Sequence, residues 1–334
     1  MVSYLEEVTF KDNVRPHTVI LGAGASRACL PEGDLNNKKL PVMNDLVEVI
    51  GLEKLLENFS IKSESKNFED IYSDIFASGQ EDLLRELQSM VRGYFSDMVL
   101  PFKPTLYDYL ICSLRGKDYI ASFNWDPLLL QAYLRCPFEV SEKPRLIFLH
   151  GNVMVGMAKE EKVCGLLMNR TTSKGSILKP VDLLYPTKQK NYSEDPFIKG
   201  QWYEFKRALS NSFYTTIFGY SAPKTDVEAR EAMLNAWSDN EVKELSQFEI
   251  IDINESALDS WDEFIVEHHY DFKTNLDESA LLSYPRRTSE YLWAWSQELK
   301  WLTPERMPFF DYLEDLYQWF EPCLKEERLK RALK

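Results

Sequence analysis

The chain has little cysteine, little histidine and no excess of basic charge. Its five cysteines include no Cys-x-x-Cys pair, which argues against a disulfide scaffold or zinc ribbon and favours reduced, buried thiols. A formal net charge of -14 argues against broad nucleic-acid binding. No apolar run approaches the roughly 20 residues that span a bilayer, and the acidic N-terminus lacks a hydrophobic signal region. We therefore expect a cytoplasmic protein without a metal, a membrane contact or direct nucleic-acid binding.

The apolar content is sufficient for a large core. Hydrophobic residues make up 44% and aromatic residues 13% of the 334 residues, so the length fits two domains or one α/β domain with an insertion. Short, continuous apolar runs are typical of strands buried on both faces of a parallel sheet. Five such runs lie at residues 18–21, 119–122, 146–149, 214–218 and 248–253.

Helical patterns between these runs predict an α/β fold, a Rossmann-like parallel sheet with helical and loop-rich insertions. The first insertion, residues 42–116, has helical periodicity at 43–56 and 81–99 on either side of the polar stretch 60–67. The second, residues 152–200, is rich in Gly, Thr, Ser, Lys and Pro and is expected to be mostly loop. We expect a catalytic domain over 1–270 and a helical C-terminal region over 271–334.

A glycine-rich turn follows the first run as Gly22-Ala23-Gly24-Ala25-Ser26. Small side chains there leave the backbone N–H groups open to a phosphate, which suggests nucleotide binding. The third glycine of the dinucleotide fingerprint is absent, because Arg27 takes its place. The turn alone therefore fits a phosphate loop and a purely structural turn about equally.

Polar and glycine residues follow the other four runs as well. Ligands of parallel α/β sheets bind at the carboxyl ends of the strands, so these residues are expected to converge there. They are Phe123, Asn124 and Asp126, then His150 and Gly151, then Gly219, Tyr220 and Ser221 with Asp226, then Asp252 and Asn254.

His150 carries the most chemistry, because imidazole titrates near neutral pH and acts as a general base. A histidine at a strand end is more often satisfied by backbone groups, but the adjacent Gly151 permits close approach of a ligand. Asn124 could orient a sugar hydroxyl or water, whereas Asp126 before Pro127 also fits an Asx turn. The other histidines, His17, His268 and His269, are interpreted as surface residues.

In this order and spacing, the motifs resemble the sirtuin-like superfamily. The segments that carry the resemblance are Gly22–Ser26, Ser122–Asp126, His150-Gly151, Gly219–Ser221 and Ile253-Asn254. They look most like the prokaryotic sirtuin-like NAD-cleaving effectors of anti-phage defence. The resemblance implies a Rossmann-like fold that binds NAD+ as substrate, with Asn124 and His150 as the catalytic pair.

The same resemblance assigns the NAD+ contacts. The turn at Gly22, Ala23, Gly24, Ala25 and Ser26 is expected to hold the pyrophosphate. Gly219, Tyr220 and Ser221 are expected to complete the phosphate or ribose cradle, and Asp252 and Asn254 to contact the adenosine side. Phe123 and Asp126, which flank the catalytic Asn124 and Trp125, complete the expected set.

Two departures from the deacetylase pattern favour hydrolysis of NAD+ itself. No paired cysteines are present to form a zinc module, and Phe123 replaces the Gln of the Gln-Asn-x-Asp motif. The alternatives are an NAD-dependent protein deacylase and a non-catalytic NAD or ADP-ribose sensor. A dehydrogenase fits least, because the Gly-x-Gly-x-x-Gly pattern is incomplete.

The C-terminal region is rich in aromatic residues. Aromatics at helical spacing are more often core than interface, yet these lie outside the expected catalytic sheet. We expect some of them to contact another subunit or a defence-system partner, since the resemblance implies control by a homo-oligomer or a partner protein. The residues are Trp293, Trp295, Trp301, Trp319 and Phe320.

Overall fold

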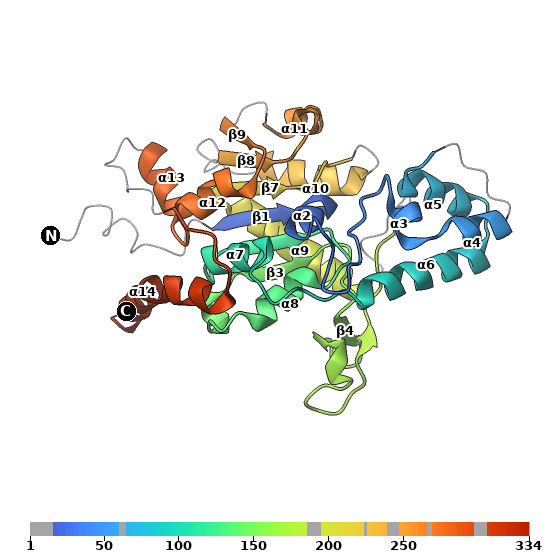
Figure 1. The fold of residues 1–334 in the computed structure, drawn as a ribbon, viewed down its shortest axis with the longest axis horizontal. Helices are drawn as coiled ribbons and strands as arrows, with labels where there is room; N and C mark the ends of the chain where they lie inside the picture. The colour runs from blue at the N-terminus through green and yellow to red at the C-terminus, as the bar shows by residue number, and fades with distance from the viewer. Residues whose placement is uncertain are drawn as a thin grey trace.

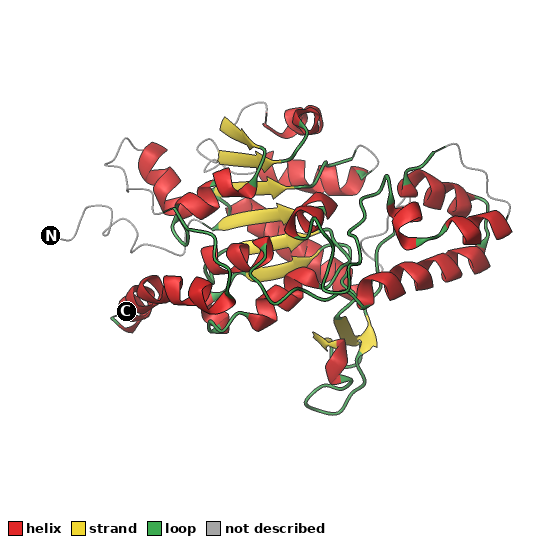
Figure 2. Cartoon of the chain, viewed as in Figure 1, coloured by secondary structure: helices red, strands yellow, loops and turns green. Residues whose placement is uncertain are grey.

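A six-stranded parallel sheet forms the centre of the protein (Figures 1 and 2). The computed structural model describes residues 16–59, 65–185, 195–223, 226–238, 247–265, 269–296 and 306–333. The strand order is β3-β2-β1-β7-β8-β9, and every neighbouring pair is parallel. The strands are β1 (His17–Leu21), β2 (Tyr119–Ser122), β3 (Arg145–Phe148), β7 (Tyr214–Phe218), β8 (Gln247–Ile251) and β9 (His269–Lys273). The predicted Rossmann-like α/β sheet is therefore confirmed.

The first five strands match the predicted apolar runs to within two residues. The sixth, β9, was missed, because its sequence His-Tyr-Asp-Phe-Lys alternates polar and aromatic residues at the edge of the sheet. His269, which was interpreted as a surface residue, begins β9, and its side chain lies outside the described residues. His268 lies outside the described residues.

Helices cover both faces of the sheet. In Figure 1, α7 and α12 lie in front of the strands and α9 and α10 lie behind them. The helices of the main body are α2 (Ala23–Cys29), α7 (Leu106–Ser113), α8 (Leu128–Arg135), α9 (Pro196–Asn211), α10 (Val227–Ser238), α11 (Leu258–Ile265), α12 (Ala280–Ser283), α13 (Thr288–Ser296) and α14 (Leu313–Ala332). No helix in the described ranges is both long and apolar enough to cross a membrane.

The first insertion is helical, as predicted, and projects from one end of the sheet (Figure 1). The helix expected over 43–56 is split, because Gly51 adopts a left-handed conformation (φ +79°) that ends α3. Asn67 caps α5 by accepting a hydrogen bond from the Glu69 backbone N–H at 2.8 Å. The helices are α3 (Leu46–Ile50), α4 (Glu53–Asn58), α5 (Phe68–Ala77) and α6 (Glu81–Ser96).

Most described residues of the second insertion lie in loops and turns, as expected, but it also contains strands that the sequence did not predict. Residues 155–180 form a small antiparallel sheet in the order β5-β4-β6, which projects away from the main body (Figure 1). Its strands are β4 (Val155–Ala158), β5 (Val163–Leu166) and β6 (Lys179–Pro180). Strand β6 has only two residues and β5 is partly exposed, so neither leaves a recognisable apolar run in the sequence.

Of the C-terminal aromatic residues, some pack in or against the core, and the others lie outside the described residues. Leu316, Phe320 and Leu324 repeat at intervals of four on α14 and are fully buried in the same core as the sheet strands. Phe320 therefore belongs to the core, and Trp319 packs partly buried against that core. The expectation that some of the five aromatics contact a partner stays a prediction. The side chains of Trp293 and Trp295, and all of Trp301, lie outside the described residues.

All five cysteines are free thiols, but not all are buried as expected. Cys29, Cys112 and Cys136 are buried, Cys323 is half-buried, and Cys164 is exposed on β5. The exposure of Cys164 follows from its place on an edge strand of the small projecting sheet.

Candidate functional site at the carboxyl ends of the strands

The strand register brings the predicted segments to one edge of the sheet. Leu21 at the end of β1 pairs with Ser122 of β2 and Phe218 of β7. Ser122 in turn pairs with Phe148 of β3. The glycine turn, the Asn124 segment, His150 and Gly219 therefore follow adjacent strand ends, as the sequence predicted.

The glycines of the turn are required by contact with the neighbouring strand end. The N–H of Gly22 donates to Phe218 O and the N–H of Gly24 to Gly219 O, both at 3.0 Å. A Cβ on Gly22 would lie 2.3 Å from Gly219 O. The Ala25 N–H donates to Gly22 O. The expectation that the turn leaves its N–H groups open is therefore wrong for Gly22, Gly24 and Ala25.

Ser26 is the centre of a buried hydrogen-bond network. Its hydroxyl donates to Asp126 Oδ2 at 2.6 Å, lies 2.6 Å from the Tyr107 hydroxyl, and accepts from Asn124 Nδ2 at 2.9 Å. Burial raises the pKa of Tyr107 well above its usual range, so the phenol stays protonated and can donate. The network joins three segments that are far apart in the sequence. Tyr107 was missed, because nothing in its local sequence marks a contact with Ser26.

Asn124 is held by its amide nitrogen. Besides Ser26, Nδ2 donates to Gly22 O at 2.8 Å, and the Asn124 N–H donates to Ser122 Oγ at 3.1 Å. Its side-chain oxygen accepts no hydrogen bond within the described part of the chain, and the residue is half-buried. That oxygen is thus positioned to accept a hydrogen bond from a ligand hydroxyl or water.

Asp126 fixes the turn after β2. Its Oδ1 accepts from the Leu128 N–H at 3.0 Å, which is the Asx turn weighed from the sequence. Its backbone oxygen accepts from Asn152 Nδ2 at 2.7 Å. Burial raises the pKa of Asp126, and the hydrogen bond from Ser26 opposes that shift. These contacts give Asp126 a structural role in tying the ends of β2 and β3 together.

His150 follows β3 and is 9% exposed. Its Nε2 lies 3.8 Å from Oδ2 of Asp226, which comes from the segment after β7. The Tyr220 hydroxyl donates to the same Oδ2 at 3.4 Å, and burial raises the pKa of Tyr220 well above its usual range. Asp226 was placed at this strand end from the sequence but was assigned no role. The structure places its carboxylate next to the imidazole.

The backbone around His150 and Gly151 packs against the segment that follows β6. Gly151 adopts φ +83°, and a Cβ there would lie 2.3 Å from Asp182 O. The Leu184 N–H donates to the backbone oxygen of His150 at 3.0 Å. Gly151 is therefore needed for backbone packing, in addition to any approach of a ligand.

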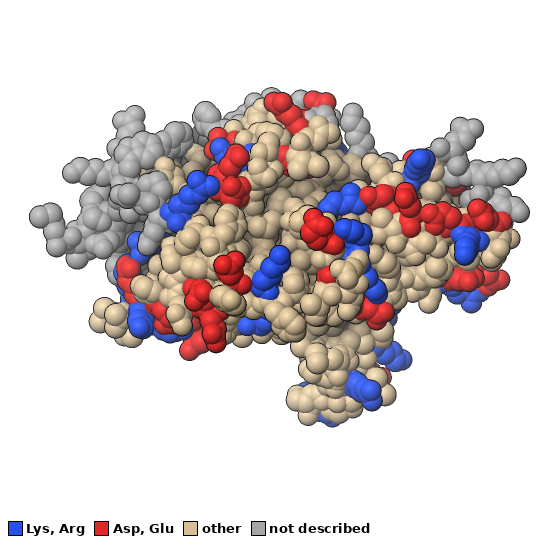
Figure 3. Space-filling model, in the orientation of Figure 1, with Lys and Arg blue, Asp and Glu red and all other residues tan. Residues whose placement is uncertain are grey.

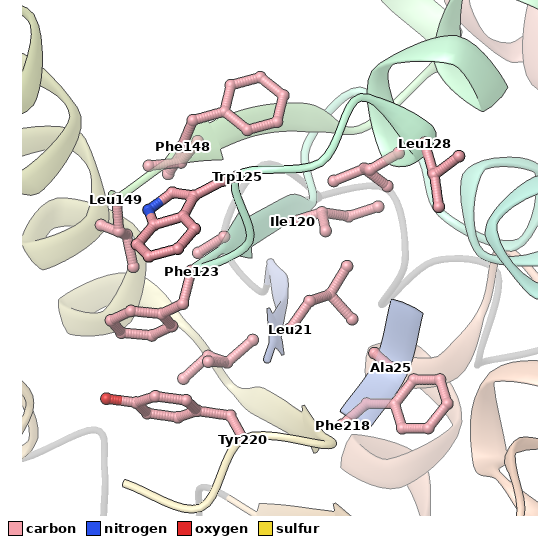
Figure 4. Packing of buried hydrophobic residues seen from close by; sticks show 14 of the residues in the cluster. Leu21, Ala25, Ile120, Phe123, Trp125, Leu128, Phe148, Leu149, Phe218 and Tyr220 are labelled. Carbon is pink, nitrogen blue, oxygen red and sulfur yellow. The ribbon is translucent and has the colours of Figure 1, made fainter. Parts of the chain in front are cut away.

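Phe123 lies in an aromatic cluster, and Figure 4 shows its ring next to that of Tyr220. Its ring stacks on Tyr220 with centroids 4.0 Å apart and meets His150 edge-on at 4.9 Å. Trp202 packs edge-on against Phe123 at 6.1 Å and donates from its indole N–H to Leu149 O at 3.0 Å. The apolar surroundings explain why an aromatic residue, and not Gln, occupies position 123.

Asp252 and Asn254 lie further along the edge. They follow β8, which is two strands away from β1, and the Asn254 N–H donates to Asp252 Oδ1 at 3.0 Å. Ser221 is exposed on the segment after β7, between these residues and the glycine turn. Their predicted contacts with the adenosine side of NAD+ remain predictions.

His17 is not a surface residue, as was expected. It begins β1, is buried, and its Nε2 lies 2.9 Å from Thr216 Oγ1. Burial lowers the pKa of His17 to about 3. It lies at the amino end of the strand, opposite the candidate site.

No family model and no curated protein matches the chain. Among solved structures, the protein is similar to one described as "Structural Basis for the Mechanism and Regulation of Sir2 Enzymes", with 14% identity, a TM-score of 0.43, and coverage of 89% of this chain and 100% of that one. A mutant of a Sir2 homologue in complex with ADP ribose gives 11% identity, a TM-score of 0.43, and coverage of 89% and 99%. A Sir2–p53 peptide–NAD+ structure gives 12% identity, a TM-score of 0.37, and coverage of 88% and 97%.

These structures belong to the superfamily that the sequence motifs resemble, but the likeness is distant. The function proposed below therefore rests on the residues of this protein. Within the described ranges, no group of three or more His, Cys, Asp or Glu is placed to hold a metal ion.

Proposed function

We propose that the protein is an NAD+ glycohydrolase, which cleaves NAD+ to nicotinamide and ADP-ribose. The observation that carries the proposal is the arrangement of Asn124 and His150 at adjacent strand ends. Asn124 is anchored through its nitrogen, which leaves its oxygen for a ligand, and His150 has Asp226 3.8 Å from Nε2. The order of motifs that resembles sirtuin-like proteins supports NAD+ as the substrate.

The reaction breaks the bond between the ribose C1′ and the nicotinamide nitrogen. The bonding electrons leave with nicotinamide, which becomes neutral, and positive charge develops on the ribose ring. Water adds to C1′ and loses a proton. In this proposal Asn124 orients the water or a ribose hydroxyl, and His150 accepts the proton. The Asp226 carboxylate stabilises the imidazolium that forms.

The remaining predicted residues form the NAD+ contacts of this proposal. In this proposal the turn Gly22–Ser26 lies next to the pyrophosphate, while Gly219–Ser221 and the segment with Asp252 and Asn254 bind the ribose and adenosine. Asn124 and the turn are parts of one hydrogen-bond network, so NAD+ bound at the turn would lie beside the reactive groups.

The test is incubation of the full chain with NAD+ alone, followed by chromatography of the products. We expect release of nicotinamide and ADP-ribose, and a loss of at least roughly 100-fold in rate for Asn124→Ala and His150→Ala. Asn211→Ala is the matched control, because Asn211 is exposed at the end of α9. Folding of each variant is checked by circular dichroism.

Three outcomes would contradict the proposal. Release of nicotinamide by both variants at the parental rate would exclude the catalytic pair. Loss of NAD+ only when an acetyl-lysine peptide is added would indicate a deacylase. Binding of NAD+ or ADP-ribose without turnover in any condition would indicate a sensor.

The proposed cellular role is depletion of NAD+ during anti-phage defence. It rests on the resemblance of the motifs to prokaryotic sirtuin-like effectors. Bacteria that express the wild type should lose NAD+ after phage infection, and bacteria that express His150→Ala should not. Equal NAD+ levels in the two strains after infection would refute this role.

A further inference from the structure

The small antiparallel sheet carries an unusual concentration of basic charge. We call residues 155–180 the basic arm. The arm has five basic residues and two acidic ones, Glu160 and Glu161, whereas the protein as a whole has 53 acidic and 39 basic residues. From Lys162 to Val181 the chain has four basic residues and no Asp or Glu. The four are Lys162, Arg170, Lys174 and Lys179, and all are exposed. Basic side chains are visible on the projecting arm in Figure 3.

Of these four cations, Lys174 interacts electrostatically with the carboxylate of Glu161. Within the described residues, none of them lies within 4.0 Å of a carboxylate as an ion pair. Elsewhere many basic side chains are paired, as Arg135 is with Asp108. The arm therefore presents a positive potential at the end of a projecting structure.

Apolar side chains lie among the cations. Met168 is 74% and Ile177 68% exposed, and Val163 on the edge strand β5 is also exposed. Exposed apolar groups beside basic ones are typical of a protein interface, because phosphate contacts need only the charge. The net charge of -14 also disfavours a polyanionic nucleic acid as the partner.

The helical insertion presents the complementary surface. Residues 68–87 contain six acidic residues and one arginine. We call the exposed side of α5 and α6 the acidic face. Its exposed residues include Asp70, Asp74, Glu81 and Glu86, and Phe76 among them is 56% exposed. The acidic face thus matches the basic arm in both respects, with charge of the opposite sign and an apolar side chain within it.

We propose that the basic arm of one copy of this chain docks onto the acidic face of a second copy. A two-fold arrangement would use both pairs of surfaces, because each copy carries one arm and one acidic face. Opposite charges steer and orient such an association, and Met168, Ile177 and Phe76 supply the apolar contact. This proposal does not depend on the enzymatic activity.

The experiment is sedimentation velocity of the full chain from about 1 to about 50 µM, at about 50 mM and about 500 mM salt. We expect a dimer at low salt that weakens at high salt, since salt screens exposed charges. The arm variant Lys162→Glu/Arg170→Glu/Lys174→Glu should weaken association by roughly 100-fold or more. The acidic-face variant Asp74→Lys/Glu81→Lys should do the same, and a mixture of the two variants should associate again.

A matched control separates the arm from net charge alone. Lys103→Glu/Lys199→Glu/Lys206→Glu changes the total charge by the same amount, and these three lysines are exposed and lie outside residues 155–180. The control should still dimerise. All variants are checked for folding by circular dichroism.

Four results would overturn the proposal. They are a wild type that stays monomeric at every concentration, an arm variant that dimerises as the wild type does, a control that dissociates as the arm variant does, and a monomeric wild type that binds a single-stranded oligonucleotide through the arm. The last result would assign the arm to nucleic-acid contact.

Discussion

Replacement of Gly219 by alanine tests the packing on which the candidate site depends. Gly219 has φ +61°, and a Cβ there would lie 2.2 Å from Ala25 N and 2.5 Å from the carbonyl carbon of Gly24. Both neighbours are backbone atoms, so no side-chain rotation can make room. The glycine turn and the end of β7 would have to separate by more than about 1 Å to reach ordinary van der Waals distances.

The expected loss of stability has two parts. A left-handed conformation costs an alanine about 1–2 kcal/mol relative to glycine. Insertion of a methyl group into a closely packed contact adds roughly 1–3 kcal/mol. We therefore expect Gly219→Ala to lower the free energy of unfolding by about 2–5 kcal/mol. The displaced turn would also carry Asn124 with it, because Asn124 Nδ2 is bonded to Gly22 O.

Gly79→Ala is the matched control. Gly79 also has a positive φ (+71°), but a Cβ there meets no atom within 4 Å. This variant should show the conformational part alone, about 1–2 kcal/mol. The measurement is urea unfolding of both variants and the wild type, followed by circular dichroism. Equal destabilisation by Gly219→Ala and Gly79→Ala would refute the claim that backbone contact fixes the turn.

Three further predictions concern other parts of the protein. Gly93→Ala, in the interior of α6 where a Cβ meets nothing within 4 Å, should raise the free energy of unfolding by about 0.5–1 kcal/mol in urea. His17 has a folded pKa of about 3, so the unfolded state binds a proton more readily between pH 6.5 and 3, and stability falls as the pH drops. Between about pH 7 and pH 5, the free energy of unfolding of His17→Gln should therefore fall by about 2 kcal/mol less than that of the wild type. Equal decreases in the two proteins would contradict this prediction. Asp226→Asn, if the proposed NAD+ hydrolysis is correct, should lower kcat roughly 10–100-fold with little change in KM, and a change in KM alone would exclude its action through His150.

The sequence was most informative where a physical rule links position to surroundings. Strands buried on both faces must be apolar, and five of the six strands were found in this way. The rule that ligands bind at the carboxyl ends of parallel strands then gathered the Asn124, His150 and Gly219 segments, and the observed register aligns them. Asp226 was found at the same edge by the same rule.

Contacts between distant segments were beyond prediction. Tyr107 contacts Ser26 although the two residues are 81 positions apart, and no local sequence pattern predicts this contact. His17 appeared polar and peripheral, but the parallel pairing of β1 with β7 buries it beside Thr216. Strands β5 and β6 of the basic arm bury too few residues to leave an apolar run, and the edge strand β9 alternates polar and aromatic residues.

The glycine turn shows how the sequence and the structure together define the role of a residue. Glycine in a turn after a strand is compatible with a bound phosphate and with close backbone packing, and the sequence could not separate the two. In the structure, Gly22 and Gly24 donate their N–H groups to the end of β7, and Asn124 donates to Gly22 O. The turn therefore fixes the distance between β1, β2 and β7 before any ligand binds. The same packing fixes the position of the Asn124 side-chain oxygen, so a ligand that donates a hydrogen bond to it finds this acceptor already oriented. Gly219→Ala should remove this preorganisation.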